Sequence, residues 1–141
     1  MTRKDKGFTL VEILIVVIIL GILAAIVIPQ FTEASNDARK SALQSDLQTV
    51  RSQLELYKVQ HLDTYPDANI ATQLTSKTNS DGTTTGTPTL GPYLQKVPTN
   101  AFNGLDTIQV GDTQSADGST GWYYNPSTGH FAPNTADHKD W

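Results

Sequence analysis

The chain contains no cysteine among its 141 residues, so neither a disulfide nor thiol chemistry contributes to its fold or its function. Charged residues make up only 17% of the chain, and the acidic ones outnumber the basic ones, which gives a formal net charge of -4. A nucleic-acid-binding surface needs clustered Lys and Arg, so we expect no nucleic-acid partner. A chain of this length supports one modest domain once its apolar segment is set aside.

Signatures of catalysis are also missing from the sequence. The three histidines, His61, His130 and His138, occur in neither H-x-H nor H-E-x-x-H spacing, which argues against a zinc hydrolase. No serine lies in a G-x-S-x-G motif and no glycine-rich phosphate loop is present. We therefore expect that the protein is not an enzyme, and a catalytic site assembled from distant residues is the alternative.

Residues 8–28 form an apolar run in which only Thr9 and Glu12 are polar. This run is long enough to cross a bilayer core of about 30 Å. The basic residues Arg3, Lys4 and Lys6 precede it, which predicts a cytoplasmic N-terminus and a C-terminus across the membrane.

Glu12 is an unusual residue for this position, because a lone carboxylate in hydrocarbon costs about 2.5–3.5 kcal/mol on insertion scales. No Lys, Arg or His follows it until Arg39. We therefore predict that the partner of Glu12 comes from outside its own helix, and that the chain works as part of an assembly.

Three interpretations of the apolar run compete. A secretory signal peptide ends in small residues before its cleavage site, whereas Ala24 and Ala25 lie inside this run and apolar residues continue to Ile28. A plain membrane anchor explains the length and the orientation but not Glu12. The third interpretation comes from a family resemblance.

The segment from Lys6 to Leu14, KGFTLVEIL, resembles the class III signal of type IV pilins and type II secretion pseudopilins, and the likeness covers residues 1 to about 36. The resemblance implies that a membrane peptidase cuts between Gly7 and Phe8 and that Phe8 becomes N-methylated. It also implies that Glu12 pairs with the N-terminal amine of a neighbouring subunit.

The amine of Phe8 is mostly protonated at neutral pH and stays charged when methylated. Because Glu12 lies one helical turn further on, the amine of its own chain is a second possible partner. A third reading is that Glu12 snorkels to the interface.

The helix should continue beyond the membrane. Apolar residues recur at spacings of four, three, four and three residues (Leu43, Leu47, Val50, Leu54, Tyr57), which predicts an amphipathic helix. We expect one helix from Phe8 to about Leu62, kinked at Pro29. On its solvent face we expect an ion pair between Arg51 and Glu55.

The second half of the chain is rich in turn residues. Residues 63–66 should end the helix, and a short helix is expected around residues 70–74. Residues 76–89 contain no large apolar residue and are predicted to be a mobile surface loop. Three short antiparallel strands are expected at residues 107–110, 121–124 and 130–132, the last two joined by a turn at 125–129. We expect the aromatic residues to fill the core (Tyr93, Phe102, Trp122, Tyr123, Phe131).

This layout predicts the α+β fold class, pilin-like, with a long N-terminal helix packed against a small antiparallel β-sheet. The expected parts are a leader (1–7), the transmembrane and assembly half of the helix (8–30), its amphipathic half (31–62), a variable loop region (63–106) and a small sheet with a C-terminal tail (107–141).

Residues Gly91 to Pro98 are similar to a stretch of the major pseudopilins of type II secretion, although the continuation at Thr99–Phe102 departs from it. The absence of cysteine points the same way, because many adhesive type IV pilins close a C-terminal loop with a disulfide. The resemblance thus favours a pseudopilus subunit that supports protein export. A type IV pilin for adhesion, motility or DNA uptake is one alternative, and a membrane-tethered periplasmic binding module is another.

The resemblance also implies partners and a location. The partners are other copies of the chain, minor pseudopilins, the prepilin peptidase and an inner-membrane assembly platform. The location is the bacterial inner membrane, crossed once with the C-terminus in the periplasm, and a filament in the periplasm or at the cell surface.

Calcium is the one cofactor to consider, because major pseudopilins commonly carry a calcium-binding loop. Calcium needs six to eight oxygen ligands. The candidates are Asp112 and Asp117 before Trp122, and Asp137 and Asp140 near the end of the chain. The alternative is that the Asp-Gly pairs serve turns.

Overall fold

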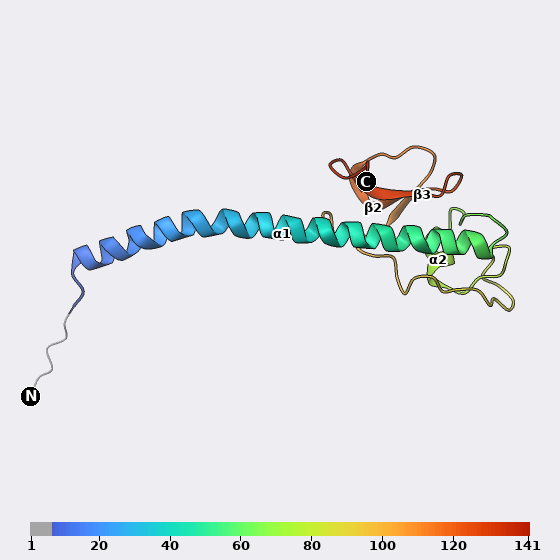
Figure 1. The fold of residues 1–141 in the computed structure, drawn as a ribbon, viewed down its shortest axis with the longest axis horizontal. Coiled ribbons are helices and arrows are strands. Elements are labelled where there is room, and N and C mark those ends of the chain that lie inside the picture. Colours follow the sequence, from blue (N-terminus) through green and yellow to red (C-terminus); the bar gives the residue numbers. More distant parts are fainter. Residues whose placement is uncertain (1–6) are drawn as a thin grey trace, which may run out of the picture. The chain divides into compact units, whose positions relative to one another are not determined.

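The computed structural model describes residues 7–141, so the expected leader lies outside the described residues except for Gly7. Two helices are followed by three strands: α1 (Leu10–Gln60), α2 (Ile70–Thr75), β1 (Ile108–Val110), β2 (Asp117–Asn125) and β3 (His130–Thr135). Figure 1 shows α1 as one uninterrupted helix, with β2 and β3 alongside its C-terminal half. The chain divides into two compact units at Ala38. The predicted α+β, pilin-like fold class is confirmed.

Helix α1 has the predicted extent to within two residues at each end, and Pro29 lies inside it. The predicted apolar stripe is buried along its whole length, since Leu43, Leu47, Val50, Leu54 and Tyr57 are all less than 5% exposed. Burying one such side chain stabilises a fold by about 1.5–3 kcal/mol. The stripe is therefore the main hydrophobic surface on which the C-terminal unit is built.

Aromatic residues complete this core. Of the five expected to fill it, Tyr93, Trp122 and Phe131 belong to one buried cluster with the stripe, Phe102 is partly buried against that cluster, and Tyr123 is buried outside it. Tyr124, which was not among the five, is buried in the same cluster as Trp122. Two of them are also held by hydrogen bonds, because the indole nitrogen of Trp122 donates to the Pro98 carbonyl at 2.7 Å and the Tyr124 hydroxyl donates to the Pro66 carbonyl at 2.8 Å. The segment from Pro66 to Pro98, which contains α2, is thereby tied to the core at both of its ends.

The sheet has the order β1-β2-β3, and β2 pairs with β3 in antiparallel fashion as predicted. Strand β1, however, runs parallel to β2, with Ile108 opposite Trp122, so the expectation of three antiparallel strands is wrong for this pair. Parallel strands need a long connection. Residues 111–121 form this connection and include the irregular first half of β2. They return the chain to the level of Ile108, so that pairing with β1 begins at Trp122.

Helix α2 confirms the short helix expected around residues 70–74. The segment 76–89, expected to be a mobile surface loop, buries some of its polar groups against the domain. Thr78 is fully buried and forms a bridge with Leu90, and the carbonyl of Gly82 accepts a hydrogen bond from Gln73 at 3.1 Å. The segment is therefore fixed to the domain at these points, because hydroxyl and backbone groups can be buried when they are hydrogen-bonded.

Candidate functional site

The predicted cleavage site lies in an exposed segment outside the helix. Gly7, Phe8 and Thr9 precede the first residue of α1 and belong to no helix or strand. The side chain of Phe8 is 83% exposed, and apart from Gly7 and its chain neighbours no atom of the described residues lies within 4 Å of the position that a Cβ on Gly7 would take. The Gly7–Phe8 bond thus has the accessible, non-helical backbone that proteolysis requires.

Helix α1 begins with a reciprocal cap formed by Thr9 and Glu12. The carboxylate oxygen Oε2 of Glu12 accepts hydrogen bonds from the Thr9 backbone N–H at 2.8 Å and from the Thr9 hydroxyl at 2.7 Å. In return, the Glu12 N–H donates to the Thr9 hydroxyl oxygen at 3.3 Å. This is a capping box of the T-x-x-E type, which satisfies backbone groups that would otherwise lack partners at the start of a helix.

The capping box corrects one expectation. Glu12 does have a hydrogen-bond partner within its own chain, although Thr9 is neutral and does not compensate the charge. The signal was visible in the sequence, because Thr9 and Glu12 have the spacing of a capping box directly before an apolar run. Among residues 7–141, the hydrogen bonds to this carboxylate all come from Thr9 and all reach Oε2. The pairing of Glu12 with an N-terminal amine stays a prediction.

Beyond Glu12, α1 exposes an almost unbroken apolar surface. The helix contains an 18-residue window with a mean hydropathy of 3.3, none of which is buried. Within it, large side chains such as Leu14 and Ile22 are more than half exposed. Such a surface needs lipid or other helices around it. The kink predicted at Pro29 stays a prediction, since the helix runs through this residue and Thr32 donates a side-chain hydrogen bond to the Ile28 carbonyl at 3.2 Å.

The four aspartates proposed as calcium ligands do not form one site. Among residues 7–141, no group of three or more His, Cys, Asp or Glu side chains could hold a metal ion. Asp117 instead accepts hydrogen bonds on Oδ1 from the Ser119 hydroxyl, the Ser119 N–H and the Ser115 hydroxyl. These bonds lower the pKa of the Asp117 carboxyl, with the Ser119 hydroxyl as the largest cause. Asp117 therefore serves a turn, and calcium binding by Asp112, Asp137 or Asp140 stays a prediction.

The side-chain amide of Asn134, in β3, fixes the loop that precedes β2. Asn134, which is fully buried, donates from its side-chain nitrogen to Thr120 Oγ1 at 2.8 Å and to Gln109 Oε1 at 3.0 Å. Its side-chain oxygen accepts from the Ala116 N–H at 2.8 Å. Nothing in the sequence pattern marked Asn134, because an asparagine in a strand acquires this role only through the residues that the fold places around it.

Arg51 also has a different role from the one expected. Its Nε donates to the Phe131 carbonyl at 3.0 Å and its Nη2 donates to the Trp141 carbonyl. Burial lowers the pKa of the guanidinium. The expected pair with Glu55 is wrong, because Glu55 accepts a hydrogen bond from the Tyr65 hydroxyl at 2.7 Å instead. The carbonyl of Phe131, near the start of β3, and that of Trp141 compete successfully for the Arg51 donors.

Known proteins resemble this chain both at its N-terminus and over most of its length. Residues 2–28 match the family model of the prokaryotic N-terminal methylation motif. The chain is 32% identical to the type II secretion system core protein G of Pseudomonas aeruginosa over 71% of this chain and 70% of that protein. It is 30% identical to the core protein G of Vibrio cholerae over 84% of this chain and 86% of that protein. No solved structure matches the chain. With an N-terminal methylation motif, a long exposed apolar helix and these relatives, the chain belongs to the type II secretion system core protein G family, the major pseudopilins.

Proposed function

We propose that this chain is a structural subunit of the pseudopilus filament of type II secretion, assembled from the inner membrane after leader cleavage and N-methylation. The observation that carries the proposal is the accessible Gly7–Phe8 bond directly before a capped apolar helix, in a chain that matches the methylation motif. The relatives are named as core proteins of a secretion system, which supports a structural role without catalysis.

The first step is processing at the membrane. The precursor is held with Arg3, Lys4 and Lys6 on the cytoplasmic side, as the positive-inside rule predicts. The prepilin peptidase cuts after Gly7 and methylates the new amine of Phe8, which keeps its positive charge. The product then presents a cation one helical turn from the Glu12 carboxylate.

The second step is recognition between subunits. In the capping box, Glu12 uses Oε2 for both hydrogen bonds from Thr9. Oε1 remains the oxygen with which Glu12 can accept a hydrogen bond from the amine of a neighbouring subunit. A charge-assisted contact of this kind is short and directional, so it sets the register in which two helices stack. The exposed apolar surface then supplies the attraction.

Other components complete the assembly. Minor pseudopilins and an inner-membrane platform act on the processed subunit, and the C-terminal unit lies in the periplasm on the surface of the filament. The alternative of a type IV pilin for adhesion, motility or DNA uptake is not favoured by the two relatives described above, which are both named core protein G.

The experiment that tests processing is intact-mass analysis of the chain purified from its host. We expect a product that begins at Phe8 and carries one methyl group, and a chain that still begins at Met1 in a strain without the peptidase. An unprocessed chain in a peptidase-competent strain would instead favour a membrane-tethered periplasmic module. Deletion of the gene should abolish secretion of type II substrates, whereas loss of surface pili with normal secretion would favour the type IV pilin.

A further inference from the structure

The C-terminal unit exposes three large apolar side chains near the end of α1. Within residues 39–141, the large apolar side chains that are strongly exposed are Leu56, Val59 and Leu62, which are 43%, 79% and 81% exposed. Leu56 and Val59 are one helical turn apart and point away from the buried positions Leu54 and Tyr57. We name these three residues the apolar tip.

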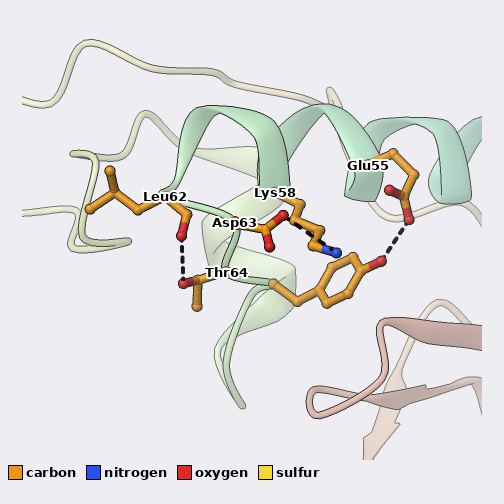
Figure 2. Close-up of polar contacts among 6 residues, drawn as sticks. Glu55, Lys58, Leu62, Asp63 and Thr64 are labelled. Carbon is orange, nitrogen blue, oxygen red and sulfur yellow. Dashed lines mark hydrogen bonds and ion pairs between the residues drawn. The ribbon is translucent and has the colours of Figure 1, made fainter.

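The exposure of Leu62 is built into the backbone. Leu62 and Asp63 both adopt left-handed conformations, with φ of 56° and 62°, at the position after a helix where glycine is usual. The Asp63 N–H donates to the Lys58 carbonyl at 3.1 Å, and the two side chains form an ion pair at 3.5 Å. Figure 2 shows the side chain of Leu62 directed away from this pair. The turn therefore holds a large apolar side chain in water, in a conformation unfavourable for leucine.

The face of α1 that leads to the apolar tip carries no charge. Exposed residues occur on it at alternating spacings of three and four (Ala42, Ser45, Thr49, Ser52, Leu56, Val59). A helix face that meets only water normally carries charged residues. Since the chain has a net negative charge, two copies repel each other wherever acidic surfaces meet, and an uncharged face is where a second copy can approach most closely.

A groove of about 1030 Å³ lies on the same unit, between α1 and the turn that joins β2 to β3. Its wall includes Leu47, Phe131 and Trp141, and Gln48 lies on its helical side. Arg51 holds the wall together through its bonds to the carbonyls of Phe131 and Trp141. Glu55 also lines the groove, and its carboxylate accepts a hydrogen bond from the Tyr65 hydroxyl at 2.7 Å. Both charged groups thus have partners of their own, and an apolar occupant would leave neither of them bare.

We propose that the apolar tip of one copy seats in this groove of the next copy. The inference rests on the proposed filament function, which makes a second copy the partner that is always present. A patch and a groove that lie at different places on one surface form a head-to-tail contact, and repetition of that contact gives an open chain rather than a closed dimer. The tip and the groove together therefore link successive periplasmic units along the filament.

The natural absence of cysteine allows a direct test in the full-length chain. A variant with Val59→Cys and Gln48→Cys should give a ladder of disulfide-linked multimers when filaments are oxidised, because each copy then links to two neighbours. Each single variant should give no ladder. The matched control combines Val59→Cys with Thr84→Cys, an exposed loop position outside the groove, and should also give no ladder.

The outcomes separate the inference from the proposed function. Filaments without a ladder, or an equal ladder from the control, would overturn the tip-and-groove contact and leave the pseudopilus function standing. If the unmodified, processed chain forms no filaments in its host, the proposed function fails and the contact fails with it.

A second pair of variants separates contact from folding. Val59→Asp should reduce filament yield by about tenfold or more, a factor that corresponds to about 1.4 kcal/mol, while Val59→Ile should keep the normal yield. Leu62→Gly should raise the melting temperature, because glycine accepts the left-handed conformation, and should nevertheless lower filament yield. Equal filament yields for Val59→Asp and the unmodified chain would overturn the proposal. Weaker binding of Val59→Asp to lipid vesicles, with an unchanged filament yield, would also overturn it.

Discussion

The imidazole of His61 lies flat against the ring of Tyr57, with 3.6 Å between the ring centroids and 3° between the planes. Its Nδ1 lies 2.8 Å from the Tyr57 carbonyl and its Nε2 lies 2.9 Å from the Thr78 hydroxyl. Because a carbonyl can only accept, Nδ1 carries a proton and donates to the Tyr57 carbonyl, while Nε2 forms a hydrogen bond with the Thr78 hydroxyl. His61 therefore joins the end of α1 to the segment 76–89, and both of its nitrogens have a partner.

Stability should fall at high pH because of Tyr57. Burial, and next the negative charge of Asp67, raises the pKa of Tyr57 to about 12 from an ordinary value of 10.0. Below pH 10 the hydroxyl is protonated in both the folded and unfolded states, and its contribution is fully present. Between pH 10 and 12 the folded state holds more protons than the unfolded state, so the free energy of unfolding decreases as pH rises.

The measurement is a series of denaturant melts from pH 8 to 12. One proton accounts for at most about 1.4 kcal/mol per pH unit. Tyr57→Phe should lose its share of the slope and keep the part due to Tyr124, whose pKa burial also raises. Identical slopes in the two proteins would show that Tyr57 titrates in the same way folded and unfolded.

Glu12→Gln and Glu12→Ala should separate the two roles of Glu12. Glutamine keeps an oxygen that can accept from Thr9, so the capping box survives, whereas alanine removes both the cap and the charge. If assembly depends on the charge, both variants should insert in the membrane, be cleaved, and fail to enter filaments. Membrane fractionation and the yield of sheared filaments measure the two steps. Normal filaments from Glu12→Gln would assign the residue to helix capping alone.

Arg51→Met should destabilise the C-terminal unit. The substitution keeps much of the length of the side chain but leaves the Phe131 and Trp141 carbonyls without their donors, at a cost of about 1–3 kcal/mol. Thermal melts followed by circular dichroism measure the loss. Lys40→Met, at an exposed position on the same helix, is the matched control and should change stability by less than about 0.5 kcal/mol. Equal effects in both variants would contradict the assigned role of Arg51.

Chelation of calcium should leave the melting temperature unchanged, because hydrogen bonds from Asn134 hold the loop before β2. Asn134→Ala should lower stability by about 1–3 kcal/mol, since it leaves buried partners such as the Ala116 N–H unpaired. Asn79→Ala, at a half-buried position where the side chain has its own hydrogen bonds, should cost less. A melting temperature that falls in EDTA and recovers with added calcium would instead support Asp112, Asp117, Asp137 or Asp140 as calcium ligands.

Much of the fold could be predicted from residue spacing. The alternation of three and four residues from Leu43 to Tyr57 identified the buried face of α1, because the helical period alone decides which side chains share a face. The direction of β1 could not be predicted, since alternation marks a strand but not its partner. For the same reason Arg51 was assigned to Glu55, its neighbour in sequence, and not to the carbonyls that the fold brings closer.

The sequence by itself determined the membrane helix, the exposed cleavage segment and the Thr9–Glu12 cap, because each depends on residues within one or two helical turns. Only the tertiary structure decided the roles of Arg51, His61 and Asn134. The Trp141 carbonyl, the Thr78 hydroxyl and the Thr120 hydroxyl, which these three side chains contact in turn, lie 90, 17 and 14 residues away along the chain. A polar side chain in a core is stabilised by whichever groups are left unpaired beside it.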